Sequence, residues 1–313
     1  MVHATSGIHA IQVYTPQHCV RASDLEEAHG VKGKYTVGLR MQENCACDEN
    51  EDAVSMALTV VRRLVEAHGV AYADIGMLQV GSESLLDRSK SIKSHIMSLF
   101  GDATNVEGTD CYHACYGGTA ALIACVNWVE SSAYDGRWAV AVCTDVSDAP
   151  EQYAFLNGAA AVAMLVGPDA PLAFEGTRVT HMVDEWDFYK PVGWRSMAPI
   201  MDGPHSKRVY GDALLHCQQA FRRCNGRCFV DDHDALVFHL GGGFKFVRDA
   251  FELALRDVHG PELSPDEVTR RFDQLVDPSL RAAVRIGPMH TAATYVNLCS
   301  LLICAPPRRG GAD

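Results

Sequence analysis

Three residue types that together carry out nucleophilic catalysis lie near the ends of separate apolar runs. They are the carboxylic acid Glu83, the thiol Cys115 and the imidazole of His239. A cysteine can accept an acyl group, a carboxylate can move a proton, and a histidine can pair with the thiol or donate to a substrate carbonyl. Taken singly, such residues are more often a buried cysteine, a solvated glutamate or a core histidine. The combination predicts nucleophilic catalysis but does not specify the reaction.

Cys115 is followed by Tyr116-Gly117-Gly118-Thr119, and the stretch Gly117–Ser132 is apolar almost all round. This pattern predicts a helix that is buried in the core. We expect Cys115 to begin the helix, where unpaired amides and the positive end of the dipole favour the thiolate. We also expect the two glycines to let a thioester approach the backbone closely.

Glu83 and His239 are also expected at strand ends. Glu83 follows an apolar strand and Gly81, and burial near a dry pocket would raise the pKa of its carboxyl group. His239 precedes Gly241-Gly242-Gly243, which is not a phosphate loop because no Lys-Ser/Thr pair follows. Ligands in open α/β sheets bind where strands end, so we expect a shared site.

Apolar runs and helical patterns alternate along the chain. Strands are predicted at Ile8–Tyr14, Met77–Gly81, Asn105–Thr109, Trp138–Cys143, Ala159–Val166 and Ala235–Leu240. Helices are predicted at Asp52–His68, Ser91–Phe100, Gly117–Ser132 and Phe246–Val258, with Pro261–Arg285 mainly helical and Asp184–Tyr210 a long loop or lid. The alternation predicts a layered α/β fold with a mostly parallel sheet.

Composition excludes several classes of function. The formal net charge of −12 over 313 residues argues against non-specific nucleic-acid binding. No apolar run reaches the ~20 residues that span a bilayer, and no targeting pattern is present, so we expect a cytoplasmic protein without membrane insertion. The twelve cysteines are expected to be reduced. Cys45/Cys47 and Cys224/Cys228 match no four-ligand zinc spacing, and no metal is predicted.

Several motifs resemble those of eukaryotic-type hydroxymethylglutaryl-CoA synthases. They are Gly33–Leu39, Val80–Ser84, Asp87–Ser91, Ala114–Ala121, Val126–Ser132, Asp187–Pro191 and Val237–His239. The resemblance, over roughly residues 7 to 260, implies an α/β, thiolase-like fold. Two similar α/β halves would form α-β-α-β-α layers, with residues 1–170 as the first half, residues 171–305 as an incomplete second half, and 306–313 as a disordered tail.

The resemblance also implies a reaction. Acetyl-CoA would condense with acetoacetyl-CoA, and hydrolysis would give 3-hydroxy-3-methylglutaryl-CoA and CoA, a step of the mevalonate and isoprenoid pathway. Cys115 would carry the acetyl group, Glu83 would remove its methyl proton, and His239 would bind the acetoacetyl thioester. The CoA thioesters are substrates, no cofactor is implied, and the family relation implies a homodimer.

Further positions match the family's site residues. The contacts to CoA or the acyl group are implied at Lys32, Gly33, Lys34, Ser206 and Lys245. Supporting roles are implied at Asp87, Tyr116, Asp145, Asp187 and Phe188. Basic side chains near Lys32 and Lys34 suit the phosphates of CoA, although the net charge of the whole chain is negative.

Three stretches depart from the family pattern. Ala149–Gly158 does not match its Asn/Thr-bearing substrate loop, although Tyr153 and Asn157 stand near those positions. In the segment Gly287–Thr291, Pro288 replaces an asparagine, and the family reads Gly-Asn-Met-Tyr-Thr there. The chain also ends without the family's last strands, which predicts a shortened second half with exposed strand edges.

These departures leave two alternatives to an active synthase. One is a non-catalytic member that binds acyl-CoA or pairs with a full-length partner. The other is a related condensing enzyme whose acyl acceptor differs, for example a carrier protein.

Overall fold

The computed structural model describes residues 5–147, 149, 151–191, 199–241 and 243–304. The strands are β1 Ser6–Tyr14, β2 His18–Arg21, β3 Glu43–Ala46, β4 Ile75–Gly81, β5 Asp110–Cys111, β6 Trp138–Ser147, β7 Gly158–Pro168, β8 Leu172–Ala173, β9 Phe188–Tyr189 and β10 Ile200–Met201. The helices are α1 Ala22–His29, α2 Ala53–His68, α3 Ile92–Ile96, α4 Gly117–Val129, α5 Gly203–Asn225, α6 Phe244–His259, α7 Pro265–Leu275, α8 Asp277–Leu280, α9 Ala283–Ile286 and α10 Ala293–Cys304. None of these helices has the length and apolar composition that crossing a membrane requires.

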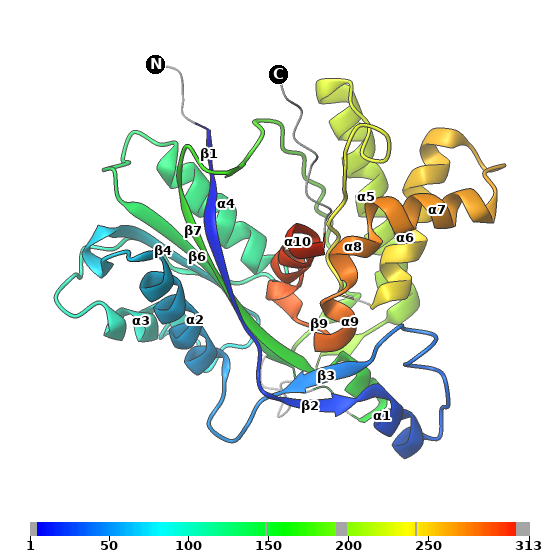
Figure 1. Ribbon diagram of the computed structural model, residues 1–313, viewed down its shortest axis with the longest axis horizontal. Coiled ribbons are helices and arrows are strands. Elements are labelled where there is room, and N and C mark those ends of the chain that lie inside the picture. The colour runs from blue at the N-terminus through cyan, green and yellow to red at the C-terminus, as the bar shows by residue number, and fades with distance from the viewer. Residues whose placement is uncertain (1–4, 148, 150, 192–198, 242, 305–313) are drawn as a thin grey trace.

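A six-stranded sheet, in the order β5-β4-β6-β7-β1-β8, lies between helices, with α2 on one face and α4 on the other (Figure 1). Side chains alternate between the two cores. Val140 and Val142 of β6 pack in the core with α2, whereas Ala139, Ala141 and Cys143 pack in the core with α4 and α10. This burial on both faces explains why the strand sequences are apolar throughout.

The sheet is mixed, so the prediction of a mostly parallel sheet is wrong. β4 pairs in parallel with β5 and β6, but β7 runs antiparallel to both β6 and β1. Residues 148–157 separate β6 from β7, and a connection of this length returns the chain beside the same strand in the opposite direction. The parallel β4–β6 pair instead has α4 as part of its crossover.

Helix α2 confirms the prediction for Asp52–His68. Asp52 accepts a hydrogen bond from the backbone N–H of Ser55, and the Ser55 hydroxyl accepts one from the N–H of Asp52. This reciprocal cap fixes the start of the helix. Gly69 ends it with φ +62°, a conformation that favours glycine.

The part of the chain after β8 is mainly helical, with a separate core in which Phe251 of α6 packs against Phe272 of α7. The predicted strand Ala235–Leu240 is wrong, because this segment is irregular. A strand needs a neighbouring ladder, and the only described turn or loop bond to its backbone N–H groups runs from Leu236 to the carbonyl of Leu275. Whether residues 1–170 and 171–305 are two similar halves stays a prediction.

The predicted loop Asp184–Tyr210 is partly wrong. It contains the short β9–β10 pair, and its last residues belong to α5. Asp202 caps that helix by accepting from the N–H of His205, and Pro204 occupies its first turn, where no N–H is needed. Residues 192–198 of the predicted loop lie outside the described residues, as does the predicted tail 306–313.

Candidate active site

Cys115 lies in the short connection between β5 and α4 rather than at the first residue of the helix, which is Gly117. Ala114 has φ +41°, and its carbonyl accepts a hydrogen bond from the N–H of Gly117. This turn places the thiol just before the helix. Positive φ at a non-glycine residue costs energy and often marks a functional site.

The two glycines after Cys115 allow neighbouring segments to pack closely, and the expected approach of a thioester to their backbone stays a prediction. A Cβ atom on Gly117 would lie 2.5 Å from the carbonyl oxygen of Cys111. On Gly118 it would lie 2.7 Å from both Cys143 Sγ and the carbonyl oxygen of Thr291. Backbone segments therefore already fill the space beside both glycines.

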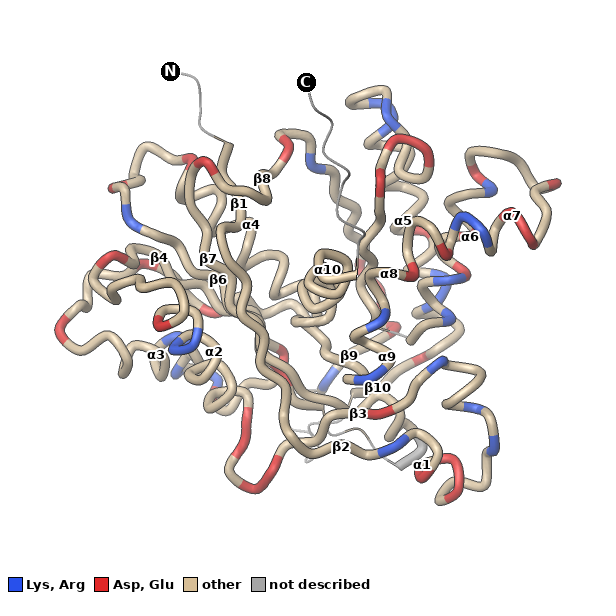
Figure 2. Tube along the Cα trace, viewed as in Figure 1, with Lys and Arg blue, Asp and Glu red and all other residues tan. Residues whose placement is uncertain are grey.

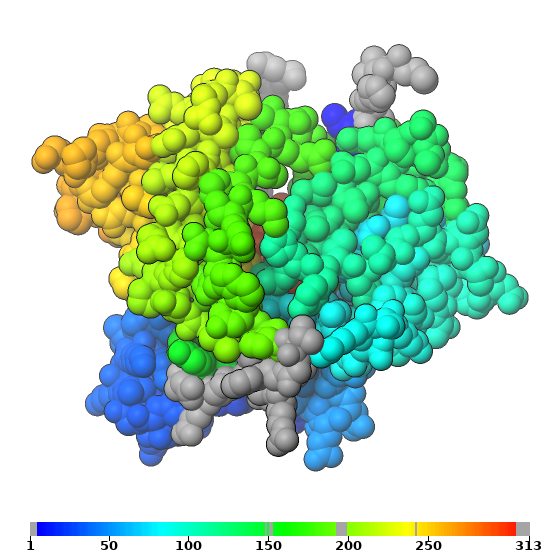
Figure 3. Space-filling model, turned by 180° about the vertical axis from the view of Figure 1, so that it is seen from behind, coloured from blue at the N-terminus to red at the C-terminus, as the bar shows by residue number. Residues whose placement is uncertain are grey.

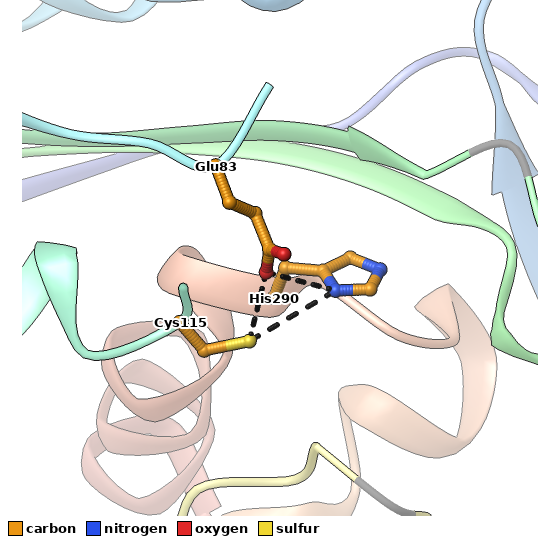
Figure 4. A group of neighbouring side chains, drawn as sticks. All are labelled: Glu83, Cys115 and His290. Carbon is orange, nitrogen blue, oxygen red and sulfur yellow. Dashed lines mark hydrogen bonds and ion pairs between the residues drawn. The ribbon is translucent and has the colours of Figure 1, made fainter. Parts of the chain in front are cut away.

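Glu83 follows β4 and meets the cysteine directly. The Cys115 thiol donates to Glu83 Oε1 at 3.0 Å, as Figure 4 shows. Glu83 is 5% exposed, and its backbone N–H donates to Asp145. The end of β4 thus presents the carboxylate to the Cys115 thiol.

His290 is the third member of this cluster, and it is not among the site residues predicted from the sequence. Its Nδ1 lies 3.4 Å from Glu83 Oε1 and 4.0 Å from Cys115 Sγ (Figure 4). Its Nε2 lies 3.3 Å from the carbonyl oxygen of Leu156, and its φ is +47°. The available signal was a histidine where the family segment has tyrosine, two residues after Pro288.

Lys190 is a second site residue that was not predicted from the sequence. Its Nζ lies 3.1 Å from Glu83 Oε2 and 3.4 Å from the Glu83 carbonyl oxygen. Glu83 is therefore held between two cationic groups, with Oε1 toward His290 and Oε2 toward Lys190.

The pKa of the Cys115 thiol and the pKa of the Glu83 carboxyl group both shift in the direction opposite to that expected from the sequence. Burial and the adjacent Glu83 carboxylate raise the pKa of the Cys115 thiol well above its ordinary value, so the resting thiol keeps its proton. Burial alone would raise the pKa of Glu83. The hydrogen bond and charge of His290, the charge of Lys190 and the thiol outweigh burial and lower it. Burial also disfavours charged His290, but the Glu83 contact raises the pKa of His290.

Asp145 joins the elements that carry the cluster. This fully buried carboxylate accepts hydrogen bonds from the N–H of Glu83, the hydroxyl of Ser84 and the N–H of Thr291. It thereby fixes the end of β4 next to the segment that bears His290. Burial and the nearby Glu83 charge raise the pKa of Asp145.

Cys115, His239 and His290 line one cavity of about 240 Å³. Leu156, Asp187, Phe188, Ser206 and Tyr210 are among its other lining residues. Figure 3 shows a hollow between the yellow-green surface of the segment around α5 and the teal surface around α4. Red-brown atoms near the C-terminal end of the chain lie at its base.

His239 reaches this cavity from the irregular segment before α6. Its carbonyl oxygen accepts a hydrogen bond from the Tyr210 hydroxyl, which ties the segment to α5. Burial, followed by the positive charge of His290, lowers the pKa of His239 to about 4. The imidazole is therefore neutral near pH 7 and retains one N–H donor.

Several other residues that were predicted as site residues are not part of the described cavity lining. Asp87 accepts from the N–H groups of Ser89 and Lys90 on an exposed loop, and Tyr116 lies edge-on to the ring of His113. The described lining of the cavity does not include them, nor does it include Lys32, Gly33, Lys34 or Lys245.

The basic members of that set lie on exposed segments. Gly33 donates to Glu26 from the loop after α1, Lys32 and Lys34 are exposed beside it, and Lys245 pairs with Asp249 on α6. Figure 2 shows this loop and α6 on the same side of the molecule.

Two of the three departures from the family pattern, at Asn157 and Pro288, can be placed in the structure. Asn157 exchanges side-chain hydrogen bonds with the backbone of Ala149, so its amide is engaged in the loop. Pro288 is not among the described lining residues of the cavity that Cys115 and His239 share, and its carbonyl oxygen would be 2.1 Å from a Cβ on Gly158. Residues 148 and 150 lie outside the described part of the loop.

Comparison with known proteins gives a consistent result. The model of the hydroxymethylglutaryl-coenzyme A synthase N-terminal domain matches residues 3–171, and that of the C-terminal domain matches residues 172–259. Hydroxymethylglutaryl-CoA synthase erg13A of Aspergillus fumigatus is 38% identical, over 97% of this chain and 74% of the relative. The Saccharomyces cerevisiae synthase is 37% identical, over 95% and 68%.

Solved structures agree with the sequence relatives. MvaS in complex with 3-hydroxy-3-methylglutaryl coenzyme A superposes with a TM-score of 0.86 at 33% identity, covering 96% of this chain and 77% of that one. The hydroxymethylglutaryl synthase of the curacin biosynthetic pathway has a TM-score of 0.87 at 25% identity, covering 96% and 74%. These likenesses bear out the thiolase-like α/β fold.

Proposed function

This chain belongs to the hydroxymethylglutaryl-CoA synthase family, and from that premise we propose that it forms 3-hydroxy-3-methylglutaryl-CoA from acetyl-CoA and acetoacetyl-CoA. One observation carries the proposal. The Cys115 thiol donates to Glu83 at 3.0 Å and opens into the cavity that His239 also lines. This cavity therefore offers a thiol that is hydrogen-bonded to a carboxylate, together with an imidazole that could bind a substrate carbonyl.

Acylation is the first step. Glu83 accepts the thiol proton while Cys115 Sγ attacks the thioester carbonyl of acetyl-CoA. The bond between the acetyl carbon and the CoA sulfur breaks, and the proton leaves with CoA. Since burial and Glu83 raise the pKa of the thiol, proton transfer to the carboxylate 3.0 Å away supplies the nucleophile.

Condensation follows on the acetylated cysteine. Its sulfur no longer donates to Glu83, which loses one of the interactions that lower the carboxyl pKa and becomes a stronger base. Glu83 removes a methyl proton, and the resulting enolate carbon attacks the ketone carbon of acetoacetyl-CoA. Neutral His239 donates its N–H to that ketone oxygen, and Glu83 returns the proton to the new alkoxide.

Hydrolysis completes the cycle. Water adds to the Cys115 thioester, the carbon–sulfur bond breaks, and the thiol regains a proton. The product keeps its bond to the acceptor CoA, so this step restores the enzyme and releases a carboxylate.

His290 and Lys190 position the base in this proposal. Each contacts one oxygen of Glu83, at 3.4 and 3.1 Å, so the carboxylate cannot rotate freely away from Cys115. Asp145 accepts hydrogen bonds from the backbone N–H of Glu83 and from that of Thr291, which follows His290. It therefore holds Glu83 and His290 in a fixed relative position. Such preorganisation lowers the cost of reaching the reactive geometry.

Further parts of the proposal concern recognition and assembly. Lys32, Lys34 and Lys245 supply positive charge for the CoA phosphates, while Ser206, Asp187 and Phe188 line the acyl cavity. The two halves, residues 1–170 and 171–305, homodimer formation and a cytoplasmic location belong to the same proposal. Sedimentation and cell fractionation test the last two.

Turnover of acetyl-CoA with acetoacetyl-CoA by this chain tests the proposed function. We expect release of free CoA thiol together with formation of 3-hydroxy-3-methylglutaryl-CoA, identified by mass. Cys115→Ala should abolish both, and Cys19→Ser, which alters an exposed thiol of β2, should leave them unchanged. Folded protein that binds CoA without turnover would favour a non-catalytic member of the family. Turnover only with an acetoacetyl carrier protein would favour a related condensing enzyme with a different acyl acceptor.

A further inference from the structure

The cluster of Glu83, Cys115 and His290 has the chemistry of a metal site. Within the described chain, these residues form a group whose ligand atoms all lie within 4.8 Å of one another. A thiolate sulfur, an imidazole nitrogen and a carboxylate oxygen are the three ligand types that Zn²⁺ takes in proteins. We propose that the cluster binds one Zn²⁺ through Cys115 Sγ, His290 Nδ1 and Glu83 Oε1.

The spacing of the three atoms suits a tetrahedral ion. With ordinary zinc bond lengths, sulfur lies about 3.6 Å from an oxygen or nitrogen ligand, and nitrogen lies about 3.4 Å from oxygen. The observed separations are 3.0 Å from sulfur to oxygen, 4.0 Å from sulfur to nitrogen, and 3.4 Å from nitrogen to oxygen. A movement of Sγ by about half an ångström reconciles them, and rotation of one side chain supplies it.

A second observation concerns the far side of the histidine ring. His290 Nε2 lies 3.3 Å from the carbonyl oxygen of Leu156, so it donates its proton there. Nδ1 then directs its lone pair toward Cys115 and Glu83 once its own proton is lost. Histidines that bind metals commonly donate the other ring N–H to a backbone carbonyl in this way.

Charge balance allows the ion into a buried position. Zn²⁺ binds cysteine as the thiolate and histidine as the neutral imidazole, so the release of protons from these ligands offsets part of the charge that the ion adds. Lys190 stays on Glu83 Oε2, the oxygen that the ion does not use.

The fourth coordination position faces the substrate cavity, since Cys115 and His290 both line it. Water or a substrate atom completes the tetrahedron there. The ion takes the sulfur electron pair that forms the acetyl thioester, so zinc binding and acetylation exclude each other. This consequence rests on the proposed function, whereas the binding itself does not.

Cobalt and zinc binding to the full chain test the inference. Co²⁺ should bind with one ion per chain and give the absorption of a thiolate-bound tetrahedral site, and Zn²⁺ should displace it. Cys115→Ser and His290→Phe should each weaken Zn²⁺ binding by about 100-fold or more. Cys19→Ser and His113→Phe, which change exposed side chains, should bind as the unaltered chain does. Thermal unfolding of each variant checks that it is folded.

The outcomes separate the two proposals. Unaltered zinc affinity in folded Cys115→Ser or His290→Phe would place the ion elsewhere and overturn the inference, whatever the turnover. One-to-one binding that both variants lose would support the site even in a chain without synthase activity. In an active chain, added Zn²⁺ should block acetylation, and a chelator should restore it.

Discussion

His290 Nδ1 lies 3.4 Å from Glu83 Oε1, so a histidine from the chain's last quarter holds the carboxylate that ends β4. The contact lowers the pKa of Glu83 against the opposing effect of burial. It also makes the chemistry of Cys115 depend on a segment that lies 175 residues away in sequence. The following predictions depend on this arrangement.

The first prediction concerns the pH dependence of acetylation. Glu83 must be ionised to accept the thiol proton, and His290 helps to keep its pKa below the ordinary value. His290→Phe should therefore move the acid limb of the single-turnover acetylation rate to higher pH. His113→Phe is the matched control, because it changes an exposed ring in the connection between β5 and α4 that also bears Cys115. An unmoved acid limb in folded His290→Phe would contradict the role given to His290.

The second prediction separates proton abstraction from binding. Glu83→Gln removes the base that takes the acetyl methyl proton, so turnover should fall by about 10²–10⁴-fold. Acetylation of Cys115 in this variant should also be slow, and the acetyl-Cys115 that does form should not exchange its methyl protons with deuterated water, as mass spectrometry of the cysteine peptide can measure. Glu49→Gln, on an exposed turn, should retain both. Exchange at the unaltered rate would assign the base to another residue.

The third prediction is a loss of stability in acid. The pKa of His239 is about 4 in the folded chain and about 6.5 when unfolded. As the pH falls from ~7.5 toward 4, the unfolded chain takes up the proton first, so folding loses up to roughly 3 kcal/mol. His239→Gln should lose less stability over this range, measured by urea unfolding at pH 7.5 and 4.5. Equal losses in the two proteins would show that His239 does not cause the effect.

The fourth prediction concerns the packing behind the nucleophile. A Cβ on Gly118 would meet Cys143 Sγ and the Thr291 carbonyl oxygen at 2.7 Å. Gly118→Ala should lower the free energy of unfolding by about 1–3 kcal/mol, because neither neighbour can retreat easily. Gly203→Ala is the control, since a Cβ there meets nothing within 4 Å. Equal stability of the two variants would refute the close packing at Gly118.

Helices and strands whose sequence carries a clear apolar pattern or a capping residue were predicted well. Helix α2 followed from its apolar spacing and the Asp52 cap, and β4, β6 and β7 followed from apolar runs. The relative direction of β7 and the irregular path of Ala235–Leu240 depend on which strands lie alongside. No single stretch of sequence contains that information.

The site shows the same division. Cys115, Glu83 and His239 have residue types and positions that indicate chemistry, and Cys115 and His239 meet in one cavity. His290 and Lys190 reach Glu83 from distant segments, so their contacts could not be read from spacing. Their charges reverse the expected pKa direction of Glu83, which shows why an isolated motif is a poor guide to protonation.

Mapping the acetyl group after brief exposure of the chain to acetyl-CoA tests the central claim most directly. Peptide mass spectrometry should find one acetyl group per chain, on Cys115, and Cys115→Ser should abolish the thioester while Cys19→Ser retains it. Folded chain that stays unacetylated, or carries the group on another cysteine, would contradict the account.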